Sequence, residues 1–390
     1  MVEWKKLGDI CEIKGRIGFR GYTRDDQVDK GKGAISLSPG NIDNGSMNYE
    51  SCTYITWDKY EESPEIIVNE GDIILCKTAS VGKVARIRHL PEKATINPQL
   101  VLIKNIQSNP QYLFYVLDDK PFQSKIKGLA GIGSVPNVSQ AKLSAIEIPI
   151  PSLFEQNRIV GILDTFTSAI DNLKEQIAQR RKQYEYYRDQ LLDLEGKDGV
   201  EMKTLGEIGE FIRGNGIQKS DFVDEGFGCI HYGQIHARYG FSAKETISRV
   251  EESLYKKCKK AKTGDVVLAT TSEDAEGVAK PFVWLGDNDV AVSGDAFIYH
   301  HNQIGKFIGY QFLTHKFMQF KVKYATGTKV VRISGENMAK FIVALPSKSE
   351  QQRIVSILDT FEAAIQNLEA QLKEREKQYD YYRNKLLTFE

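Results

Sequence analysis

The pattern of hydrophobic and polar positions is most regular in two stretches, residues 155–195 and 350–390. In each stretch apolar residues recur at alternating spacings of four and three, the a/d pattern of a coiled-coil helix. The stretches share about 25 of 41 aligned positions at a constant offset of 195, so they are copies of one helix. The predicted contact positions are Ile159, Leu163, Phe166, Ile170, Leu173, Ile177, Tyr184, Tyr187 and Leu191, then Ile354, Leu358, Phe361, Ile365, Leu368, Leu372, Tyr379, Tyr382 and Leu386.

Both helices carry a start signal and one polar interruption. Ser152–Glu155 and Ser347–Glu350 have the spacing of a capping box. Arg180 and Arg375 interrupt the two patterns, either as long side chains that reach solvent or as polar residues that set the register. Each predicted helix is about 60 Å long, and its apolar stripe needs a partner along that length. The other copy offers a stripe of the same length and chemistry. Parallel and antiparallel pairing are both open; we expect antiparallel pairing, which relates two equivalent units by a two-fold axis.

A globular domain precedes each helix. In residues 1–150, a short helical pattern at 7–13 is followed by β-like runs that turn signals separate. A helix and a last strand, 145–150, close the domain. The predicted strands are 34–37, 54–56, 66–68, 72–76, 84–87 and 100–103, and the predicted helix is 110–126.

Residues 199–345 repeat this order. LGEI at 205–208 corresponds to LGDI at 7–10, and GDVVL at 264–268 corresponds to GDIIL at 71–75. The offset drifts within the domains, so insertions and deletions fall in their loops. The predicted fold class is α+β: two similar mixed α/β domains joined by two long helices, which form an intramolecular antiparallel coiled coil with pseudo-two-fold symmetry. The expected divisions are 1–150, 151–198, 199–345 and 346–390.

Composition adds constraints on compartment and ligand class. The 52 basic and 52 acidic side chains balance, so any affinity for nucleic acid must be local or shared with a partner. The five cysteines lack CxxC spacing, which argues against a zinc site or a disulfide framework and favours the cytoplasm. The sequence has no apolar run of membrane-spanning length, and its start does not resemble a signal peptide.

The motifs of common enzyme classes are missing. The sequence has no phosphate-binding G-x-x-x-x-G-K-[ST] loop, and Asn97-Pro98-Gln99 only approaches the motif of an amino-methyltransferase. The triplet 12–14 resembles the tail of a nuclease motif but lacks upstream acids. His231 and His236 lack a third metal ligand. We therefore predict no catalytic residues and no metal site.

Basic and aromatic side chains in glycine-rich loops are candidates for contacts with DNA. Arginine can bind guanine edges or phosphates, and glycine lets the backbone approach closely. The alternative is an ordinary charged loop facing solvent. The candidates are Lys14, Arg16, Arg20, Tyr22, Arg24, Lys77, Ser80 and Lys83 in the first domain, and Arg213, Asn215, Lys219, His231, Gln234, His236, Arg238, Tyr239, Thr271, Ser272, Lys329 and Arg332 in the second.

Together these features resemble the specificity (S) subunit of type I restriction–modification systems over essentially the whole chain. The most specific marks are EQNRIVGILD at 155–164 and EQQRIVSILD at 350–359. The resemblance implies that each domain is a target recognition domain reading half of a bipartite site on double-stranded DNA. It implies that the helices set the spacer and dock two methyltransferase (M) subunits.

The resemblance also implies where the cofactors reside. This chain would hold none: S-adenosylmethionine would bind to the M subunits, and ATP and Mg to restriction (R) subunits, two of which can join. Two alternatives stay open from the residues. One is an S-like subunit of a related bifunctional restriction enzyme, and the other is a coiled-coil interaction scaffold that does not read DNA.

Overall fold

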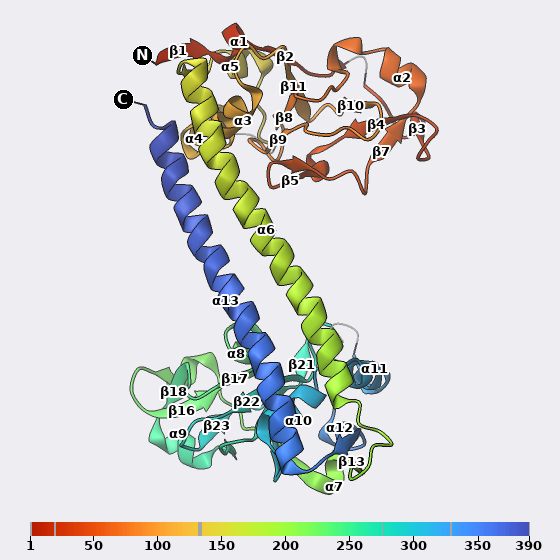
Figure 1. Cartoon of the computed structure of the whole chain (residues 1–390), viewed down its shortest axis with the longest axis vertical. Helices are drawn as coiled ribbons and strands as arrows, with labels where there is room; N and C mark the ends of the chain where they lie inside the picture. The colour runs from red at the N-terminus through yellow and green to blue at the C-terminus, as the bar shows by residue number, and fades with distance from the viewer. Residues whose placement is uncertain (1, 19–20, 132–134, 275, 328–329, 390) are drawn as a thin grey trace. The chain divides into compact units, whose positions relative to one another are not determined.

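The computed structural model describes residues 2–18, 21–131, 135–274, 276–327 and 330–389. It divides into two compact units, each containing part of both long helices (Figure 1). Unit 1 comprises Met1–Asn172 and Leu372–Glu390, and unit 2 comprises Leu173–Gln371. Among the described residues, no helix is both long enough and apolar enough to cross a membrane. All five cysteines are free.

Unit 1 contains two four-stranded sheets. The order of the first sheet is β2-β11-β8-β9, and all its pairs are antiparallel. The order of the second is β10-β4-β7-β3, with β10 parallel to β4. A separate antiparallel pair joins β1 to β12. The strands are β1 (Glu3–Lys6), β2 (Glu12–Lys14), β3 (Gln27–Val28), β4 (Ala34–Leu37), β5 (Ile42–Asp43), β6 (Ser46–Met47), β7 (Thr53–Ile55), β8 (Ile73–Cys76), β9 (Val84–Arg86), β10 (Ala94–Ile96), β11 (Leu100–Lys104) and β12 (Glu147–Ile150).

The helices of unit 1 lie mainly on one face of the first sheet. Alternate residues of β8 enter two cores: Ile73 and Leu75 pack with the helices, while Ile74 and Cys76 pack with the second sheet. A strand that is covered on both faces has a continuous apolar sequence, which explains the apolar residues of GDIIL. The helices are α1 (Leu7–Ile10), α2 (Trp57–Glu61), α3 (Pro110–Asp118), α4 (Lys120–Leu129) and α5 (Gln140–Ser144), with 3-10 turns η2 (Pro39–Asn41) and η3 (Pro64–Ile66).

Unit 2 repeats this plan with additional strands. Its sheets have the orders β14-β24-β20-β22-β17 and β15-β18-β16-β23-β19, and β13 pairs with β26. The strands are β13 (Glu201–Thr204), β14 (Gly209–Arg213), β15 (Phe222–Val223), β16 (Phe227–Ile230), β17 (Ser242–Ala243), β18 (Ser248–Val250), β19 (Lys260–Ala261), β20 (Val266–Ala269), β21 (Thr271–Ser272), β22 (Lys280–Trp284), β23 (Val290–Val292), β24 (Ala296–His301), β25 (Val331–Arg332) and β26 (Ile342–Leu345). The short helices are α7 (Leu205–Ile208), η4 (Lys219–Asp221), α8 (Tyr232–Ala237), α9 (Glu252–Lys257), α10 (Gly305–Gln311), α11 (His315–Tyr324) and α12 (Gly335–Met338).

The repeated Gly-Asp pair is a turn that introduces the central strand of each unit. Gly71 and Gly264 both have φ of +92°, a conformation that side chains disfavour. The following aspartates close the turn: Asp72 accepts a hydrogen bond from Asn69 N at 2.8 Å, and Asp265 accepts one from Lys262 N at 2.6 Å. The motif therefore has a structural explanation.

The long helices are α6 (Leu153–Leu192) and α13 (Lys348–Leu387), each of 40 residues. In unit 1, Phe166 stacks on Tyr382 with ring centroids 5.3 Å apart. In unit 2, Tyr187 stacks on Phe361 at 5.5 Å. An offset of 195 relates the two pairs, and each joins an early residue of one helix to a late residue of the other. The predicted antiparallel pairing is therefore confirmed in each unit.

The motif that opens each helix anchors it to its globular domain. Gln156 accepts a hydrogen bond from Asn109 N and donates one to Pro151 O, both at 2.8 Å. Gln351 makes the equivalent bonds with Ile304 N at 3.2 Å and Pro346 O at 3.0 Å. These bonds explain the glutamine of the repeated EQ motif.

The aspartate that ends the motif completes the anchor. Tyr115 donates a hydrogen bond to Asp164 at 2.5 Å, and Tyr310 donates one to Asp359 at 2.7 Å. Burial, followed by the hydrogen bond to Asp164, raises the pKa of Tyr115 above its usual value. Both phenols therefore remain protonated donors at neutral pH. The helix anchor is hereafter Tyr115, Gln156 and Asp164 in unit 1, and Tyr310, Gln351 and Asp359 in unit 2.

Two predicted features of the long helices have a different detail in the structure. The predicted seam does not serve only helix pairing: Ile159 and Leu163 are fully buried in the core of unit 1, and Ile354 and Leu358 in that of unit 2. The capping boxes are half formed. Ser152 and Ser347 each accept the backbone N–H three residues later, while the glutamates pair with the arginines of their own helix turn.

Three predicted elements also differ. The predicted helix 110–126 is divided into α3 and α4, because the backbone of Asp119 between them is extended and Pro121 lies in the first turn of α4, where a missing backbone N–H is tolerated. The predicted strand 66–68 is wrong, since Pro64–Ile66 forms a 3-10 turn. The early helix ends at Ile10, and Glu12–Lys14 is strand β2.

Candidate nucleic-acid interface

In unit 2, two predicted loops meet at the end of the central strand β20. β21 pairs with β25, so Thr271 lies opposite Arg332 and Ser272 lies opposite Val331. His236 Nε2 lies 3.0 Å from Thr271 O. The pairing unites polar side chains from three separate parts of the sequence.

Arg213 reaches the same place from β14. Its guanidinium is exposed, donates from Nε to Gly294 O at 2.9 Å and lies 3.8 Å from Asp295. Thr270, which precedes β21, donates to Asp295 O from its backbone N at 3.1 Å and its hydroxyl at 3.2 Å. We call Arg213, His236, Thr271, Ser272 and Arg332 the β20 cluster.

Unit 1 has an equivalent junction after β8. Thr78 forms an antiparallel bridge with Asn137, and its hydroxyl donates to Asn137 Oδ1 at 2.9 Å. Val138 N donates to Lys77 O, and Ala79 N to Pro136 O, each at 2.9 Å. Ser80 and Lys83 are exposed at the edge of this loop. We call Lys77, Thr78, Ser80, Lys83 and Asn137 the β8 cluster.

A side chain of a neighbouring helix supports each loop: the half-buried Gln123 in unit 1 and the buried Lys321 in unit 2. In unit 1, Gln123 donates to Gly82 O at 2.8 Å and Leu117 O at 2.7 Å. In unit 2, Lys321 donates to Glu276 O at 2.6 Å and Val278 O at 2.9 Å. Burial lowers the pKa of Lys321 to about 8, against the effect of nearby Asp274 and Glu276. The loops thus have the same position but different chemical supports.

Some predicted DNA-binding residues are enclosed within their own unit. Arg16 is 4% exposed and donates to Ile96 O and the Thr95 hydroxyl, both at 3.2 Å. Gln234 is buried and donates to the Ser248 hydroxyl at 2.6 Å. These side chains stabilise loops and are not available on the surface, in contrast to the prediction.

Two further candidates have structural partners. Tyr239 is buried in a core, where its hydroxyl accepts a hydrogen bond from Ile247 N at 2.8 Å. His231 is buried, and its Nδ1 accepts one from Gly233 N at 3.2 Å at the start of α8. Burial, followed by nearby Lys219, lowers the pKa of His231, so the ring is neutral at physiological pH. Neither ring is presented to a ligand on the surface.

The other candidates among the described residues lie partly or fully at the surface. Asn215 uses its side-chain oxygen to accept from Lys259 N at 2.5 Å, and Tyr22 shares a hydrogen bond of 2.7 Å with Ser36. Lys14 pairs with Glu12 at 2.9 Å. Arg24, Lys219 and Arg238 are exposed. Arg20 and Lys329 lie outside the described residues.

Sequence reasoning missed Asn137, Asp295, Gln123 and Lys321. Asn137 lies 59 residues from Thr78, so no local pattern could have indicated their pairing. Within the described ranges, no group of three or more His, Cys, Asp or Glu side chains could hold a metal ion. The arrangement offers hydrogen-bond donors and acceptors and positive charge, the chemistry of recognition.

Comparisons with known proteins identify the family. The family model of the type I restriction modification DNA specificity domain matches residues 1–180 and 197–376. The specificity subunit of the type I restriction enzyme EcoR124I/EcoR124II of Escherichia coli is 31% identical, over 72% of this chain and 70% of that protein. The putative specificity subunit S.HindORF215P of Haemophilus influenzae is 28% identical, over 72% of each chain.

Two solved structures share the fold. A chain from a structure of the assembly and conformational transition of the type I R-M system has a TM-score of 0.61 at 18% identity, covering 99% of this chain and 97% of that one. The type I S subunit from M. genitalium has a TM-score of 0.56 at 16% identity, covering 100% and 97%. The chain therefore belongs to the type I restriction–modification specificity family and is a non-catalytic specificity (S) subunit.

Proposed function

We propose that each unit reads one half of a bipartite site on double-stranded DNA, unit 1 through the β8 cluster and unit 2 through the β20 cluster. The observation that carries this proposal is the equivalent position of the two clusters. Each lies where the loop after the buried central strand meets the loop between the last two short helices of the domain, α4 and α5 in unit 1 and α11 and α12 in unit 2. The side chains differ: two lysines, two hydroxyls and an amide in unit 1, against two arginines, two hydroxyls and an imidazole in unit 2.

The chemistry of the clusters suits base reading supported by phosphate contacts. An arginine can donate two hydrogen bonds to guanine, and an asparagine can bind adenine in the same way. Lysines contribute mainly to phosphate contacts, which carry little sequence information. Exposed Arg332 and Arg213 are therefore the proposed base readers of unit 2, and Lys77 and Lys83 the proposed phosphate contacts of unit 1.

The proposal extends to partners and cofactors. The domains 1–150 and 199–345 are the recognition modules, and the helices 151–198 and 346–390 set the spacer and dock two M subunits in the cytoplasm. This chain binds no cofactor: S-adenosylmethionine belongs to the M subunits, and ATP and Mg to R subunits that join them. The repeated helix anchor supports this division, because it fixes each domain to a helix by the same bonds.

A pair of variants tests the assignment. Arg332→Ala in the complex with its M subunits should cost about 1–3 kcal/mol of binding and relax recognition in one half-site only. Lys83→Ala should weaken binding to all sequences about equally and reduce its salt dependence. The measurement is binding to a library of randomised half-sites at two salt concentrations. Arg249→Ala, an exposed arginine of unit 2 outside the cluster, is the matched control and should bind like the parent chain.

The proposal fails if Arg332→Ala alters neither half-site preference nor affinity. It also fails if Arg249→Ala has the same effect as Arg332→Ala, because the cluster would then contribute only general positive charge.

A further inference from the structure

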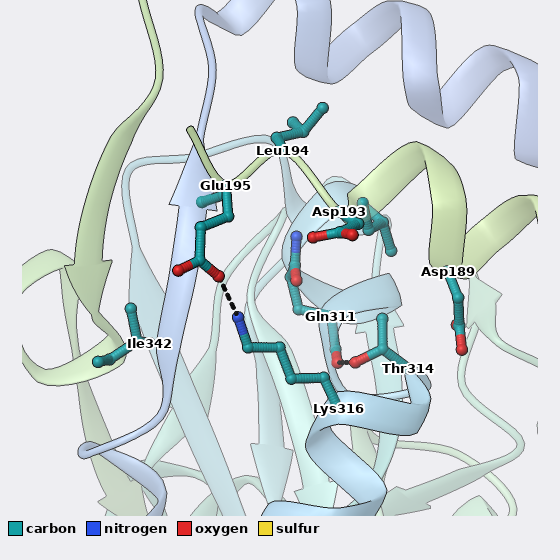
Figure 2. Close-up of a pocket in the computed structure, with 10 residues that line it drawn as sticks. Asp189, Asp193, Leu194, Glu195, Gln311, Thr314, Lys316 and Ile342 are labelled. Atoms are coloured by element: carbon teal, nitrogen blue, oxygen red, sulfur yellow. Dashed lines mark hydrogen bonds and ion pairs between the residues drawn. The ribbon is translucent and has the colours of Figure 1, made fainter. Parts of the chain in front are cut away.

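A cavity of about 230 Å³ lies in unit 2, under the last turn of α6. Its walls come from the end of α6, strand β26 and the junction of α10 and α11 (Figure 2). Leu192, Leu194, Ile342 and Ala344 make part of the wall apolar. The β20 cluster contributes none of its residues to the wall, so the DNA-reading proposal does not account for the cavity.

One buried donor in this wall has no partner. Gln311 is 4% exposed, and its Nε2 makes no hydrogen bond among the described residues. Its backbone oxygen is occupied, since it accepts from the Thr314 hydroxyl at 2.7 Å. Figure 2 shows the Gln311 amide directed toward the cavity. Because buried donors are nearly always satisfied, the amide indicates a ligand with an acceptor oxygen.

One carboxylate at the cavity also has no partner. Asp189 accepts from Arg188 at 2.9 Å and from His315 N at 3.1 Å, and Glu195 pairs with Lys316 at 3.3 Å. Asp193 lines the same cavity, and its carboxylate has no hydrogen bond or ion pair within the described part of the chain; only its backbone N is bonded, to Asp189 O at 3.0 Å. The cavity therefore combines a free anion, a free donor and an apolar wall.

A neighbouring groove gives access for a polypeptide. It has a volume of about 770 Å³ and shares Asp189 and Asp193 with the cavity. Its lining includes Tyr186, which is 58% exposed, and Met318. A polypeptide in this groove would reach the cavity by passing Asp193, which lines both.

The equivalent place in unit 1 lacks these features. The cavity there has a volume of about 50 Å³. At the offset of 195, Gln311 corresponds to Val116, Asp193 to Thr388 and Ile342 to Glu147. The unpartnered amide and carboxylate are therefore specific to unit 2 and are not a by-product of the repeated fold.

We propose that this cavity binds a lysine or arginine side chain presented by a partner polypeptide. The cation pairs with Asp193, the aliphatic stem packs on Leu192, Leu194 and Ile342, and the backbone carbonyl of the same residue accepts from Gln311. A neutral apolar side chain would leave the carboxylate unpaired, and an acidic one would meet three carboxylates and one lysine. The site is independent of DNA reading.

Ligand-observed saturation-transfer NMR on the full chain tests the proposal. The probes are the Nα-acetyl N-methylamides of lysine and arginine, with the norleucine compound as the neutral control. The basic probes should bind with Kd of about 1 mM, the range expected for so few contacts, and the norleucine probe at least about threefold more weakly. Butylamine tests the contribution of the carbonyl and should also bind more weakly.

Variants separate the two contacts. Asp193→Asn should weaken the basic probes about three- to fivefold, as expected for an exposed ion pair, without changing the norleucine probe. Gln311→Leu should weaken all three amide probes about three- to tenfold and leave butylamine unchanged. Asp198→Asn, a nearby exposed aspartate that does not line the cavity, is the control.

Any of three outcomes overturns the proposal. These are no transfer to either basic probe, equal transfer to the norleucine probe, or unchanged affinity in Asp193→Asn. Because Asp193 is exposed, this variant is expected to fold, and a melting temperature equal to that of the parent chain would verify this.

Discussion

Units 1 and 2 have the same connection to their helices and different surfaces at the ends of their central strands. The helix anchor repeats bond for bond: Tyr115 with Asp164 in unit 1, and Tyr310 with Asp359 in unit 2. The loops that carry the β8 and β20 clusters have equivalent positions but different side chains. The comparison separates two roles within one fold, a fixed attachment and a variable surface that we propose reads DNA.

The two anchors nevertheless have different neighbours. Asp164 accepts a second hydrogen bond from the neutral amide of Gln111 at 3.2 Å, whereas Asp359 pairs with the ammonium of Lys306 at 2.9 Å. The arginines near the C-terminal ends of the two long helices also differ. Arg383 of α13 forms ion pairs with Asp118 and Asp119 in unit 1, whereas the equivalent Arg188 of α6 pairs with Asp189 in unit 2. These differences make the units separately testable.

The largest effect should follow from placing a charge in one core at a time. Leu163→Asp should destabilise unit 1 by about 4 kcal/mol or more, because the carboxylate would be buried without a partner. Leu358→Asp should do the same to unit 2. Hydrogen exchange followed by mass spectrometry should show lost protection in one unit per variant. Leu153→Asp, at a 60% exposed position of α6, should change stability by less than about 0.5 kcal/mol.

Equal loss of protection in both units from either core variant would contradict their independence. It would mean that the helices, rather than the domain cores, hold the whole chain together.

Lowering the pH should destabilise unit 2 through the protonation of His301. Burial, followed by nearby His300, lowers the pKa of His301 to about 4. The unfolded chain then binds one more proton than the folded chain between the usual histidine pKa and about 4, so stability falls as pH falls through this window. The loss amounts to about 3 kcal/mol. The corresponding residue of unit 1 is Ile106, and His301→Ile should remove this pH dependence.

Chemical denaturation of the parent chain and of His301→Ile at pH 7 and pH 4 measures the effect. The difference in unfolding free energy between the two chains should change by about 3 kcal/mol over this range. An unchanged difference would show that His301 protonates equally in the folded and unfolded chains.

The smallest effects should come from the anchor hydroxyls. Tyr115→Phe should cost about 2 kcal/mol of unit 1 stability, because it removes a hydrogen bond to a charged group. Tyr310→Phe should cost only about 1 kcal/mol, since Lys306 still pairs with Asp359. Urea denaturation of each variant checks the order. A larger loss in Tyr310→Phe would contradict the compensating role of Lys306.

Local sequence patterns predicted the parts of the fold that depend on repeated spacing. The two long helices and the Gly-Asp turns each have a signal within a few residues, whereas the antiparallel pairing was expected only from the duplication of the whole unit. The split between α3 and α4 was missed because an apolar periodicity continues across Asp119. The prediction for Arg16 failed for a different reason: a charged residue in a glycine-rich loop indicates exposure, yet its partners Thr95 and Ile96 lie about 80 residues away.

The candidate site was predictable only as a set of loops. Sequence placed Thr271 and Arg332 in separate loops, and their pairing through β21 and β25 depends on the whole sheet. The support of these loops by Gln123 and Lys321 had no sequence signal, because both residues lie on ordinary amphipathic helices.

One measurement tests the central claim that each unit reads its own half-site on a shared attachment. Residues 199–345 would be replaced by a second copy of residues 1–150, the helices would be kept, and methylated adenines would be mapped by single-molecule sequencing in cells that supply the M subunits. The account predicts a symmetric bipartite site made of two inverted copies of the half-site of unit 1. Methylation at the original asymmetric site would contradict it, because the target would then not be read by the exchanged domain.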